Sequence, residues 1–195
     1  MGSISLDKDI ILDAAEEAIR RFGPHKANIC DAAKALKVSH AAIYRYFENK
    51  TALWNAVTER WLNRIFAPLE PILHEDLPVE KKLQRWLTLL VQGKRKSAFD
   101  DPEMFANYTA MAADASEVLE RHMEQLVSQL ESIIIQGATE GIFSVAEPHQ
   151  AAKAIFLATS RFHHPAFVNE WYNDDIEQKF QTVVALLING IKTRC

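Results

Sequence analysis

Residues 28–50 read NICDAAKALKVSHAAIYRYFENK, and this stretch decides how the N-terminal part of the chain folds. Apolar residues recur at helical spacing in two short segments, which the turn Lys37-Val38-Ser39 separates. Asn28 is positioned to cap the first segment, and Ser39 is positioned to cap the second. Two short capped helices joined by a tight turn are typical of a helix-turn-helix.

The composition of the chain is that of an ordinary globular protein. Its 195 residues are 48% hydrophobic, which is enough to bury a sizeable core. No run of roughly 18 apolar residues predicts a membrane span, and the first ten residues lack the basic and then apolar pattern of a secretory signal. We therefore expect a cytoplasmic protein without membrane contact.

The charge is distributed unevenly along the chain. The formal net charge is −4, but residues 1–50 carry eight Lys and Arg against seven Asp and Glu, and the remainder carries fourteen against nineteen. This mild asymmetry is compatible with a small nucleic-acid-binding head on an acidic body.

No motif predicts an enzyme, a metal site or a cofactor. The two cysteines, Cys30 and Cys195, are far apart and have no metal-ligand spacing, so we expect neither a disulfide framework nor structural zinc. There is no nucleophile elbow and no phosphate-binding glycine loop. The pair His163-His164 precedes Pro165, and adjacent helical side chains diverge by about 100 degrees, so helix-end histidines are favoured over a metal site.

The periodicity is helical nearly throughout, which predicts an all-α protein of about nine helices. A first helix is expected over residues 7–22, ended by Gly23-Pro24, and Asn49 is placed to cap a fourth. After Pro68, Pro71 and Pro78 the expected helices lengthen; they cover about 79–99, 102–113, 114–140, 148–162 and 174–191. We expect a helix-turn-helix domain over residues 1–50 and a helical effector-binding and dimerisation domain over residues 51–195.

The N-terminal residues resemble a known family. The ordered set covers about the first 55 residues and resembles the N-terminal domain of the TetR family of transcriptional regulators; it comprises Ile11-Leu12, Ala14-Ala15, Phe22, Asn28-Ile29, Ala32-Ala33, Val38-Ser39, Ile43-Tyr44, Tyr46-Phe47, Lys50 and Leu53. The resemblance implies an Ω-shaped homodimer, a ligand pocket in the body, and release of DNA when ligand binds. Asn28 stands where the family usually has Thr, and Ala27 stands where a second Thr is common.

The second short helix of the pair is the expected DNA-reading element. A helix of about two turns is not stable alone, so Ile43 and Phe47 must anchor it and leave its other side free. Ala41 and Ala42 allow a close approach to base edges, and Lys50 adds charge to a helix N-terminus that already favours phosphate. The expected contacts to double-stranded DNA are Asn28, Lys37, Ser39, His40, Ala41, Ala42, Tyr44, Arg45, Tyr46 and Lys50.

The body offers candidates for two further sites. Aromatic and methionine side chains suggest a pocket for a small apolar or aromatic effector, although such a stripe is more often packed core; they are Trp61, Trp86, Phe105, Tyr108, Met111, Met123 and Phe156. Apolar residues of the last two helices are expected to form a homodimer interface, with intrachain core as the alternative; they are Ile155, Thr159, Phe162, Phe180, Val184, Leu187 and Ile188.

The sequence thus predicts a DNA-binding transcriptional regulator, a repressor that a small molecule releases from an inverted-repeat operator. The alternative is an all-helical small-molecule sensor or carrier that does not use DNA. Tyr44, Tyr46 and Lys50 favour the first reading. Singly, Tyr44 could be a core tyrosine, Lys50 a solvated charge and Ser39 a turn cap, but their order within a short stretch favours DNA contact.

Overall fold

The computed structural model describes residues 6–193, and Cys195 lies outside them. Within that range the chain forms α-helices and short 3-10 helices and no strand, with one isolated bridge between Phe143 and Lys192. The prediction of an all-α protein is confirmed. The chain divides into two compact units, residues 1–63 with 101–119 and residues 64–100 with 120–195.

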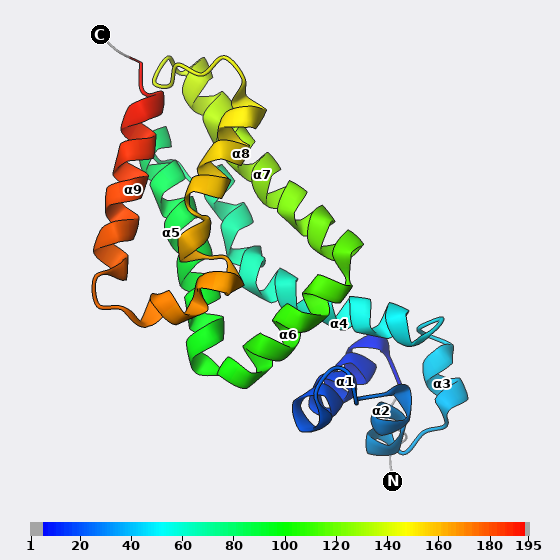
Figure 1. Ribbon diagram of the computed structural model, residues 1–195. Helices are drawn as coiled ribbons and strands as arrows, with labels where there is room; N and C mark the ends of the chain where they lie inside the picture. The colour runs from blue at the N-terminus through cyan, green and yellow to red at the C-terminus, as the bar shows by residue number, and fades with distance from the viewer. Residues whose placement is uncertain (1–5, 194–195) are drawn as a thin grey trace. The chain divides into compact units, whose positions relative to one another are not determined.

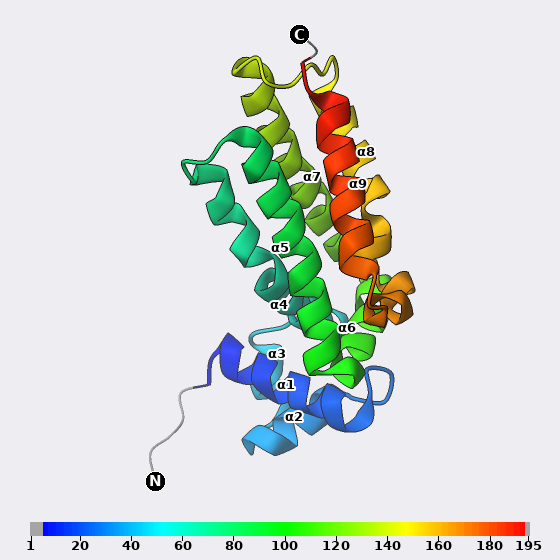
Figure 2. The same cartoon turned by 90° about the vertical axis from the view of Figure 1, so that its left-hand side faces the viewer.

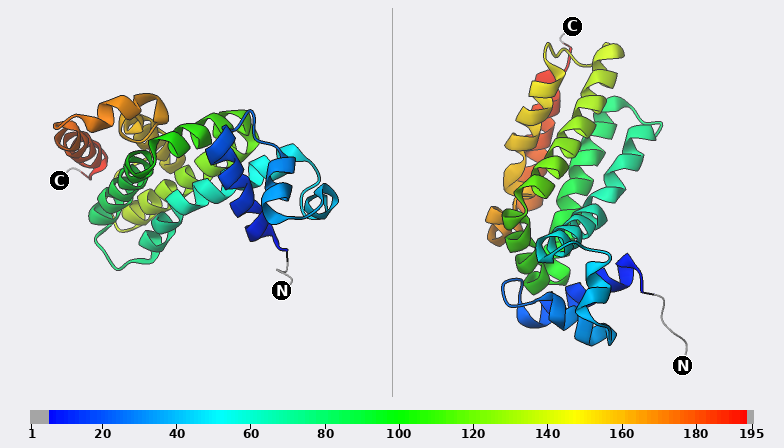
Figure 3. Two further views of the ribbon diagram at one scale, coloured as in Figure 1. Left: turned by 90° about the horizontal axis from the view of Figure 1, so that it is seen from below. Right: turned by 90° about the vertical axis from the view of Figure 1, so that its right-hand side faces the viewer.

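The first unit is built from five helical segments: α1 (Lys8–Phe22), α2 (Ile29–Leu36), α3 (His40–Tyr44), the part of α4 (Lys50–Phe66) up to residue 63, and α6 (Pro102–Asp114). Helices α1 and α2 pack against each other, and α3 adjoins α2 (Figure 3). The apolar stripe of α1 supplies the fully buried Ile11 and Ile19, and Ile43 and Leu53 add to this core from α3 and α4.

Side-chain caps mark the starts of these helices, and a glycine ends α1. The Asp7 carboxylate accepts from the Ile10 backbone N–H at 2.9 Å, and Gly23 ends α1 with a φ of +74°. The Asn49 side chain accepts from the Ala52 N–H at 2.8 Å and so starts α4. In α6, the Asp101 side chain accepts from the Met104 N–H at 3.1 Å, and Pro102 follows it directly.

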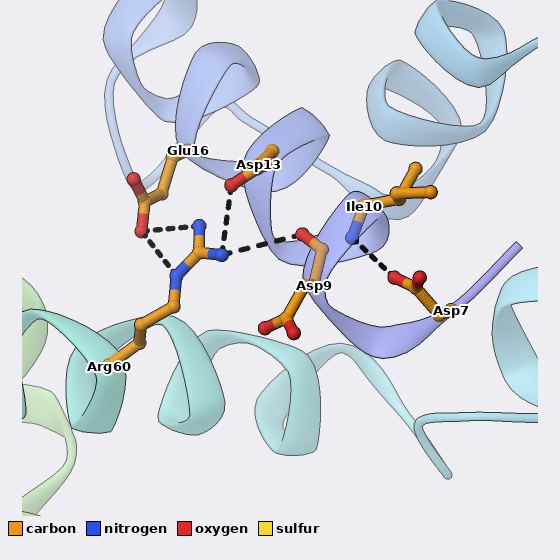
Figure 4. Close-up of polar contacts among 6 residues, drawn as sticks. All are labelled: Asp7, Asp9, Ile10, Asp13, Glu16 and Arg60. Atoms are coloured by element: carbon orange, nitrogen blue, oxygen red, sulfur yellow. Dashed lines mark hydrogen bonds and ion pairs between the residues drawn. The ribbon is translucent and has the colours of Figure 1, made fainter.

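Arg60 of α4 joins α4 to α1 (Figure 4). Its guanidinium lies 2.7 Å from the Glu16 carboxylate and 2.9 Å from the Asp13 carboxylate. It also donates to the Asp9 carbonyl at 3.4 Å. The fork of the guanidinium suits several acceptors at once, so one side chain ties α4 to the first three turns of α1.

The second unit is a helical bundle. The helices that lie along its long axis are α5 (Val79–Asp100), most of α7 (Ser116–Thr139), α8 (Pro148–Ala158) and α9 (Ile176–Ile191) (Figures 1 and 2). Three 3-10 segments complete it, over Ala67–His74, Ser160–Phe162 and Pro165–Tyr172. The core includes Trp86, Leu87, Leu130 and Phe180, each with 1% exposure or less. The Trp86 indole N–H donates to the Gln129 side-chain oxygen at 2.8 Å, which satisfies the polar atom of that buried ring.

The loop after α7 is fixed against the end of α9. Phe143 packs on Gly137, where a Cβ atom would come within 2.2 Å of the phenyl ring, so only glycine fits at this position. The Ser144 N–H donates to the Ile191 carbonyl at 2.8 Å, and the Thr193 N–H donates to the Ile142 carbonyl at 2.9 Å. The C-terminal helix is therefore anchored at its end by backbone hydrogen bonds.

Two helix boundaries differ from those expected. Helix α3 has five residues, because the chain leaves it after Tyr44. Helix α8 ends at Ala158 rather than near Phe162, and 3-10 turns follow it.

Candidate nucleic-acid interface

The turn between α2 and α3 has the geometry that a helix-turn-helix requires. Lys37 ends α2 in the left-handed region with a φ of +56°, and its N–H donates to the Lys34 carbonyl at 3.2 Å. The Val38 N–H donates to the Ala33 carbonyl at 3.0 Å. The Ser39 hydroxyl then accepts from the Ala42 N–H at 3.3 Å and starts α3.

Helix α2 begins with a reciprocal capping box. The Asn28 side-chain oxygen accepts from the Asp31 N–H at 3.2 Å, and the Asp31 carboxylate accepts from the Asn28 N–H at 3.0 Å. Asn28 therefore acts as the cap that the sequence predicts, and its half-buried side chain lies at the positive end of the helix.

Two residues anchor α3 and leave its other face to solvent. Ile43 is fully buried and Phe47 is 7% exposed. His40, Ala41 and Arg45 are exposed, Ala42 is half-buried, and Tyr44 is 49% exposed. His40, Ala41 and Tyr44 therefore lie on the solvent side of α3, and the small side chains of Ala41 and Ala42 leave its first turn accessible.

Two further side chains of the predicted set, Tyr46 and His40, also have partners within the chain. The Tyr46 hydroxyl donates to the Leu6 carbonyl, and the ring is half-buried, so this tyrosine ties the end of the helix-turn-helix to the chain before α1. The His40 Nδ1 atom lies 3.9 Å from the Cys30 sulfur, which brings the first residue of α3 close to α2. Exposed Tyr44 and Lys50 remain the stronger candidates for phosphate contact.

Lys50 is the first residue of α4 and stands beside a cavity of about 250 Å³. Its ammonium lies 5.2 Å from the centroid of the Trp54 ring, and the Trp54 indole N–H donates to the Pro24 carbonyl at 3.2 Å. The cavity is lined by Pro24, His25, Lys50, Thr51, Trp54, Asn55, Thr58, Met111, Asp114 and Ala115. The lysine is thus exposed, held near an aromatic ring, and located at a helix N-terminus.

The seven residues expected to line an effector pocket divide between the two units. Trp61 stacks on Tyr108 at 4.9 Å and meets Phe105 edge-on at 6.1 Å, and all three are buried in the first unit with Met111. Trp86, Met123 and Phe156 belong to the second unit, where Trp86 is fully buried and the other two are half-buried.

The residues expected at a dimer interface lie mainly in the core of the second unit. Phe162 packs edge-on against Phe180 at 5.3 Å, and both rings are buried. Ile155, Thr159, Val184 and Ile188 are buried as well, and Leu187 is half-buried. In the single chain, most of these side chains pack within the second unit, which is the alternative that the sequence left open. The exposed apolar side chains of these helices are Leu157 and Leu186, which are 73% and 71% exposed.

His163 and His164 point to different surroundings. The buried His163 ring lies 4.8 Å from the Phe156 ring, and its Nε2 is 3.3 Å from the Phe156 carbonyl oxygen. His164 is exposed, and its Nδ1 accepts from the Ala166 N–H at 3.2 Å. Among residues 6–193, no group of three or more His, Cys, Asp and Glu side chains is arranged to hold a metal ion.

A basic group that the sequence reading did not identify lies in the core of the second unit. Lys94, His122 and His163 are 6%, 4% and 4% exposed. Lys94 follows Leu83, Leu87 and Leu90 at helical spacing, so its position on the apolar face of α5 is the sequence signal that predicts its burial.

A search of the described helices for a membrane-spanning segment finds none with sufficient length and apolar character.

Comparison with known proteins agrees with this architecture. The model of bacterial regulatory proteins of the tetR family matches residues 11–57, and the model of the tetracyclin repressor-like C-terminal domain matches residues 79–184. The HTH-type transcriptional regulator YhgD of Bacillus subtilis is 24% identical over 94% of both chains.

Solved structures share the fold over nearly the whole chain. A putative TetR-family transcriptional regulator of Mesorhizobium loti has a TM-score of 0.73 at 18% identity, covering 95% of this chain and 96% of that one. The transcriptional regulator FadR of Bacillus subtilis, in complex with stearoyl-CoA, has a TM-score of 0.67 at 20% identity, covering 95% and 100%. With its capped helix-turn-helix and its helical second unit, the chain belongs to the TetR family of DNA-binding transcriptional regulators.

Proposed function

We propose that this regulator is a repressor that binds an inverted-repeat operator as a homodimer and leaves it when a small molecule binds. The observation that carries the DNA-binding part is the solvent-facing side of α3, held in place by buried Ile43 and Phe47. The TetR family supplies the regulatory context, since its members are transcriptional regulators. A cytoplasmic location fits this role.

The DNA contacts divide into two kinds. Ala41 and Ala42 of α3, with Arg45 directly after it, are the proposed contacts to base edges in the major groove. Tyr44 and Lys50, with Ser39, are the proposed contacts to phosphates on either side. Alanine offers only apolar contact to bases, so we assign part of the specificity to Arg45, Lys37 and DNA shape.

A single helix-turn-helix head makes few contacts with DNA. A homodimer supplies a second head, which binds the second half-site of the operator. Half-sites bound by two helix-turn-helix heads lie about 34 Å or a multiple of it apart. Leu157 of α8 and Leu186 of α9 are exposed leucines in the second unit, and we assign the subunit contact to the outer surfaces of these two helices. Their exposure is what an unpartnered half of an apolar interface shows.

Selection of binding sites from random double-stranded DNA tests the proposal directly. The full-length protein should enrich an inverted repeat, and a mobility shift on that repeat should show a dimer bound to both halves. Failure to enrich any sequence, with the protein folded and dimeric, would contradict DNA reading and favour a small-molecule sensor.

A further inference from the structure

The cavity beside Lys50 lies within the first unit, to which all of its lining residues belong. Its volume is about 250 Å³. Exposed Lys50 and Asp114 stand at its mouth, and buried Thr58 and Met111 form its floor. The cavity is therefore open to a solute at one end and closed by buried side chains at the other.

The floor of the cavity contains a polar atom without a partner. The Thr58 side chain is fully buried, and its hydroxyl has no hydrogen-bond partner among the described residues. The large majority of buried polar side chains in folded proteins have such a partner, so this exception calls for an explanation. Because the cavity adjoins Thr58, a molecule bound in it can supply the missing hydrogen bond.

A polar stripe of α4 lines the cavity. Thr51, Asn55 and Thr58 follow one another at spacings of four and three residues, which places them on one face of the helix. Thr51 is exposed, Asn55 is half-buried and Thr58 is fully buried, and all three are lining residues. The stripe therefore offers hydrogen bonds from the mouth of the cavity to its floor.

Two opposite charges stand at the mouth. Lys50 begins α4, where the helix N-terminus also favours an anion, and Asp114 is the last residue of α6, where the helix C-terminus favours a cation. Among the described residues, no ion pair joins these two side chains to each other or to a third side chain. A ligand that carries both charges therefore meets an unpaired partner for each.

The size of the cavity restricts the ligand to a small molecule. At about 30 Å³ for each water-sized group, its volume of about 250 Å³ has room for roughly eight non-hydrogen atoms. Pockets for drug-sized molecules begin at about 300 Å³. The Trp54 indole N–H already donates to the Pro24 carbonyl at 3.2 Å, so the ring offers apolar contact to the carbon atoms of the ligand.

We propose that this cavity binds an α-amino acid with an uncharged polar side chain. Lys50 and the first turn of α4 hold its carboxylate, and Asp114 holds its ammonium group. The Thr58 hydroxyl bonds to the polar end of its side chain. Asp114 would repel a simple carboxylate and Lys50 would repel a simple amine, whereas the zwitterion is attracted by both residues.

A bound amino acid shares Lys50 with the DNA. The carboxylate of the ligand and a phosphate of the operator compete for the same ammonium group, so the ligand should weaken operator binding. This consequence rests on the proposed function, in which Lys50 contacts phosphate. Binding of the amino acid to the free protein does not depend on it.

Isothermal titration of the full-length protein without DNA tests the ligand class. The probes are glutamine and asparagine. The analogues without the carboxylate are 4-aminobutanamide and 3-aminopropanamide, those without the ammonium group are glutaramate and succinamate, and leucine replaces the polar side chain. At least one of the two amino acids should bind with a Kd of about 1 mM or tighter. Each of its analogues that lacks one charge should bind about tenfold more weakly, and leucine about three- to tenfold more weakly.

Two variants outside the proposed DNA contacts test the residue assignments. Asp114→Asn should weaken binding of the amino acid about threefold or more and reduce its advantage over the analogue without the ammonium group. Thr58→Val should bind the amino acid no better than leucine. The controls should keep wild-type affinity; they are Glu103→Gln, on the exposed surface of α6, and Thr109→Val, whose hydroxyl already donates to the Phe105 carbonyl.

Mobility shifts on the selected operator measure the competition at Lys50. A saturating concentration of the amino acid should weaken operator binding and reduce the slope of log K against log salt by about one phosphate contact. The slope of Lys50→Ala should not change when the amino acid is added. An unchanged slope for the wild type would contradict a shared lysine.

The inference is overturned if neither amino acid binds, if any analogue binds as tightly as its parent amino acid, or if Thr58→Val or Asp114→Asn keeps wild-type affinity. Operator binding by the wild type without added amino acid separates this failure from failure of the proposed function. Binding to the selected repeat leaves the DNA-reading assignment intact, whatever the titrations show.

Discussion

At the residue scale, Thr58 of α4 carries a hydroxyl without a hydrogen-bond partner among the described residues. The side chain is fully buried and lines the cavity beside Lys50. Thr109 of α6, in the same unit, donates its hydroxyl to the Phe105 carbonyl at 2.8 Å. A buried polar group without a partner costs about 1–3 kcal/mol of stability.

Thr58→Val should therefore stabilise the protein. We expect an increase of about 1 kcal/mol in the free energy of unfolding, or about 2–4 °C in Tm for a chain of this size. Thr109→Val is the control and should leave Tm unchanged or lower it. A loss of stability in Thr58→Val would mean that ordered water in the cavity satisfies the hydroxyl.

His163 makes stability depend on pH. The pKa of His163 is lowered from the ordinary value of 6.5 to about 3 in the folded protein. The main cause is burial, followed by the charge of Lys94. Between these values the unfolded chain binds a proton that the folded chain does not, so stability falls as the pH falls through this window. The loss approaches about 1.4 kcal/mol per pH unit.

Denaturant unfolding at pH 7 and pH 5 measures this effect. The wild type should lose about 2 kcal/mol through His163 between these values. The change should be smaller by that amount in His163→Leu, and unaffected in His25→Ala, since His25 is exposed. Equal losses in all three proteins would show that other groups control the acid sensitivity.

At the element scale, the contact between α1 and α4 depends on Arg60. Its side chain is 20% exposed, and that of Glu16 is 17% exposed, so both charges are partly removed from water. Removing one partner leaves the other poorly solvated, and this cost exceeds the value of an exposed ion pair.

Arg60→Met should lower the free energy of unfolding by about 1–3 kcal/mol. The control is Arg85→Met, because Arg85 pairs with Glu75 at 3.1 Å with its side chain 55% exposed. That pair should be worth less than about 1 kcal/mol. Urea denaturation compares the two variants, and equal losses would contradict a special role for the contact in Figure 4.

Element types and most helix starts follow from local chemistry and could be predicted. Asn28, Ser39 and Asn49 each cap a helix as expected, because a cap is decided by residues adjacent in sequence. The end of α8 was predicted near Phe162, but the helix ends at Ala158. The apolar pattern continues through Phe162, but the chain turns into 3-10 helices after Ala158, where Thr159 bonds back to Ile155.

Features that depend on distant residues could not be predicted in the same way. The Tyr46 hydroxyl meets a carbonyl forty positions earlier, and no local pattern indicates this pairing. The sequence identifies the apolar stripes of α8 and α9, but periodicity does not tell an intrachain core from a subunit interface. Burial of Lys94 was overlooked because a charged residue is ordinarily exposed.

At the scale of the whole molecule, the second unit carries the face assigned to dimerisation. Leu157→Glu combined with Leu186→Glu places like charges on that face and should convert the dimer to a monomer at micromolar concentration. The folded monomer should keep its helical content, because both side chains are exposed in the chain.

Sedimentation equilibrium measures this prediction, and Ile135→Glu is the matched control. Ile135 of α7 is 47% exposed and lies outside α8 and α9, so its substitution should leave the dimer intact. If the double leucine variant remains dimeric, the subunit interface does not include Leu157 and Leu186. Weaker operator binding should accompany loss of the dimer, since only one half-site is then held.

The measurement that tests the central claim most directly is the salt dependence of binding to the selected operator for wild type and Lys50→Ala. Lys50 is exposed at the start of α4, and we expect its loss to weaken binding to all sequences. It should also reduce the slope of log K against log salt by about one phosphate contact. Lys81→Ala, an exposed lysine of the second unit, should keep the wild-type slope. An unchanged slope in Lys50→Ala would contradict the placement of the DNA backbone beside α3 and α4.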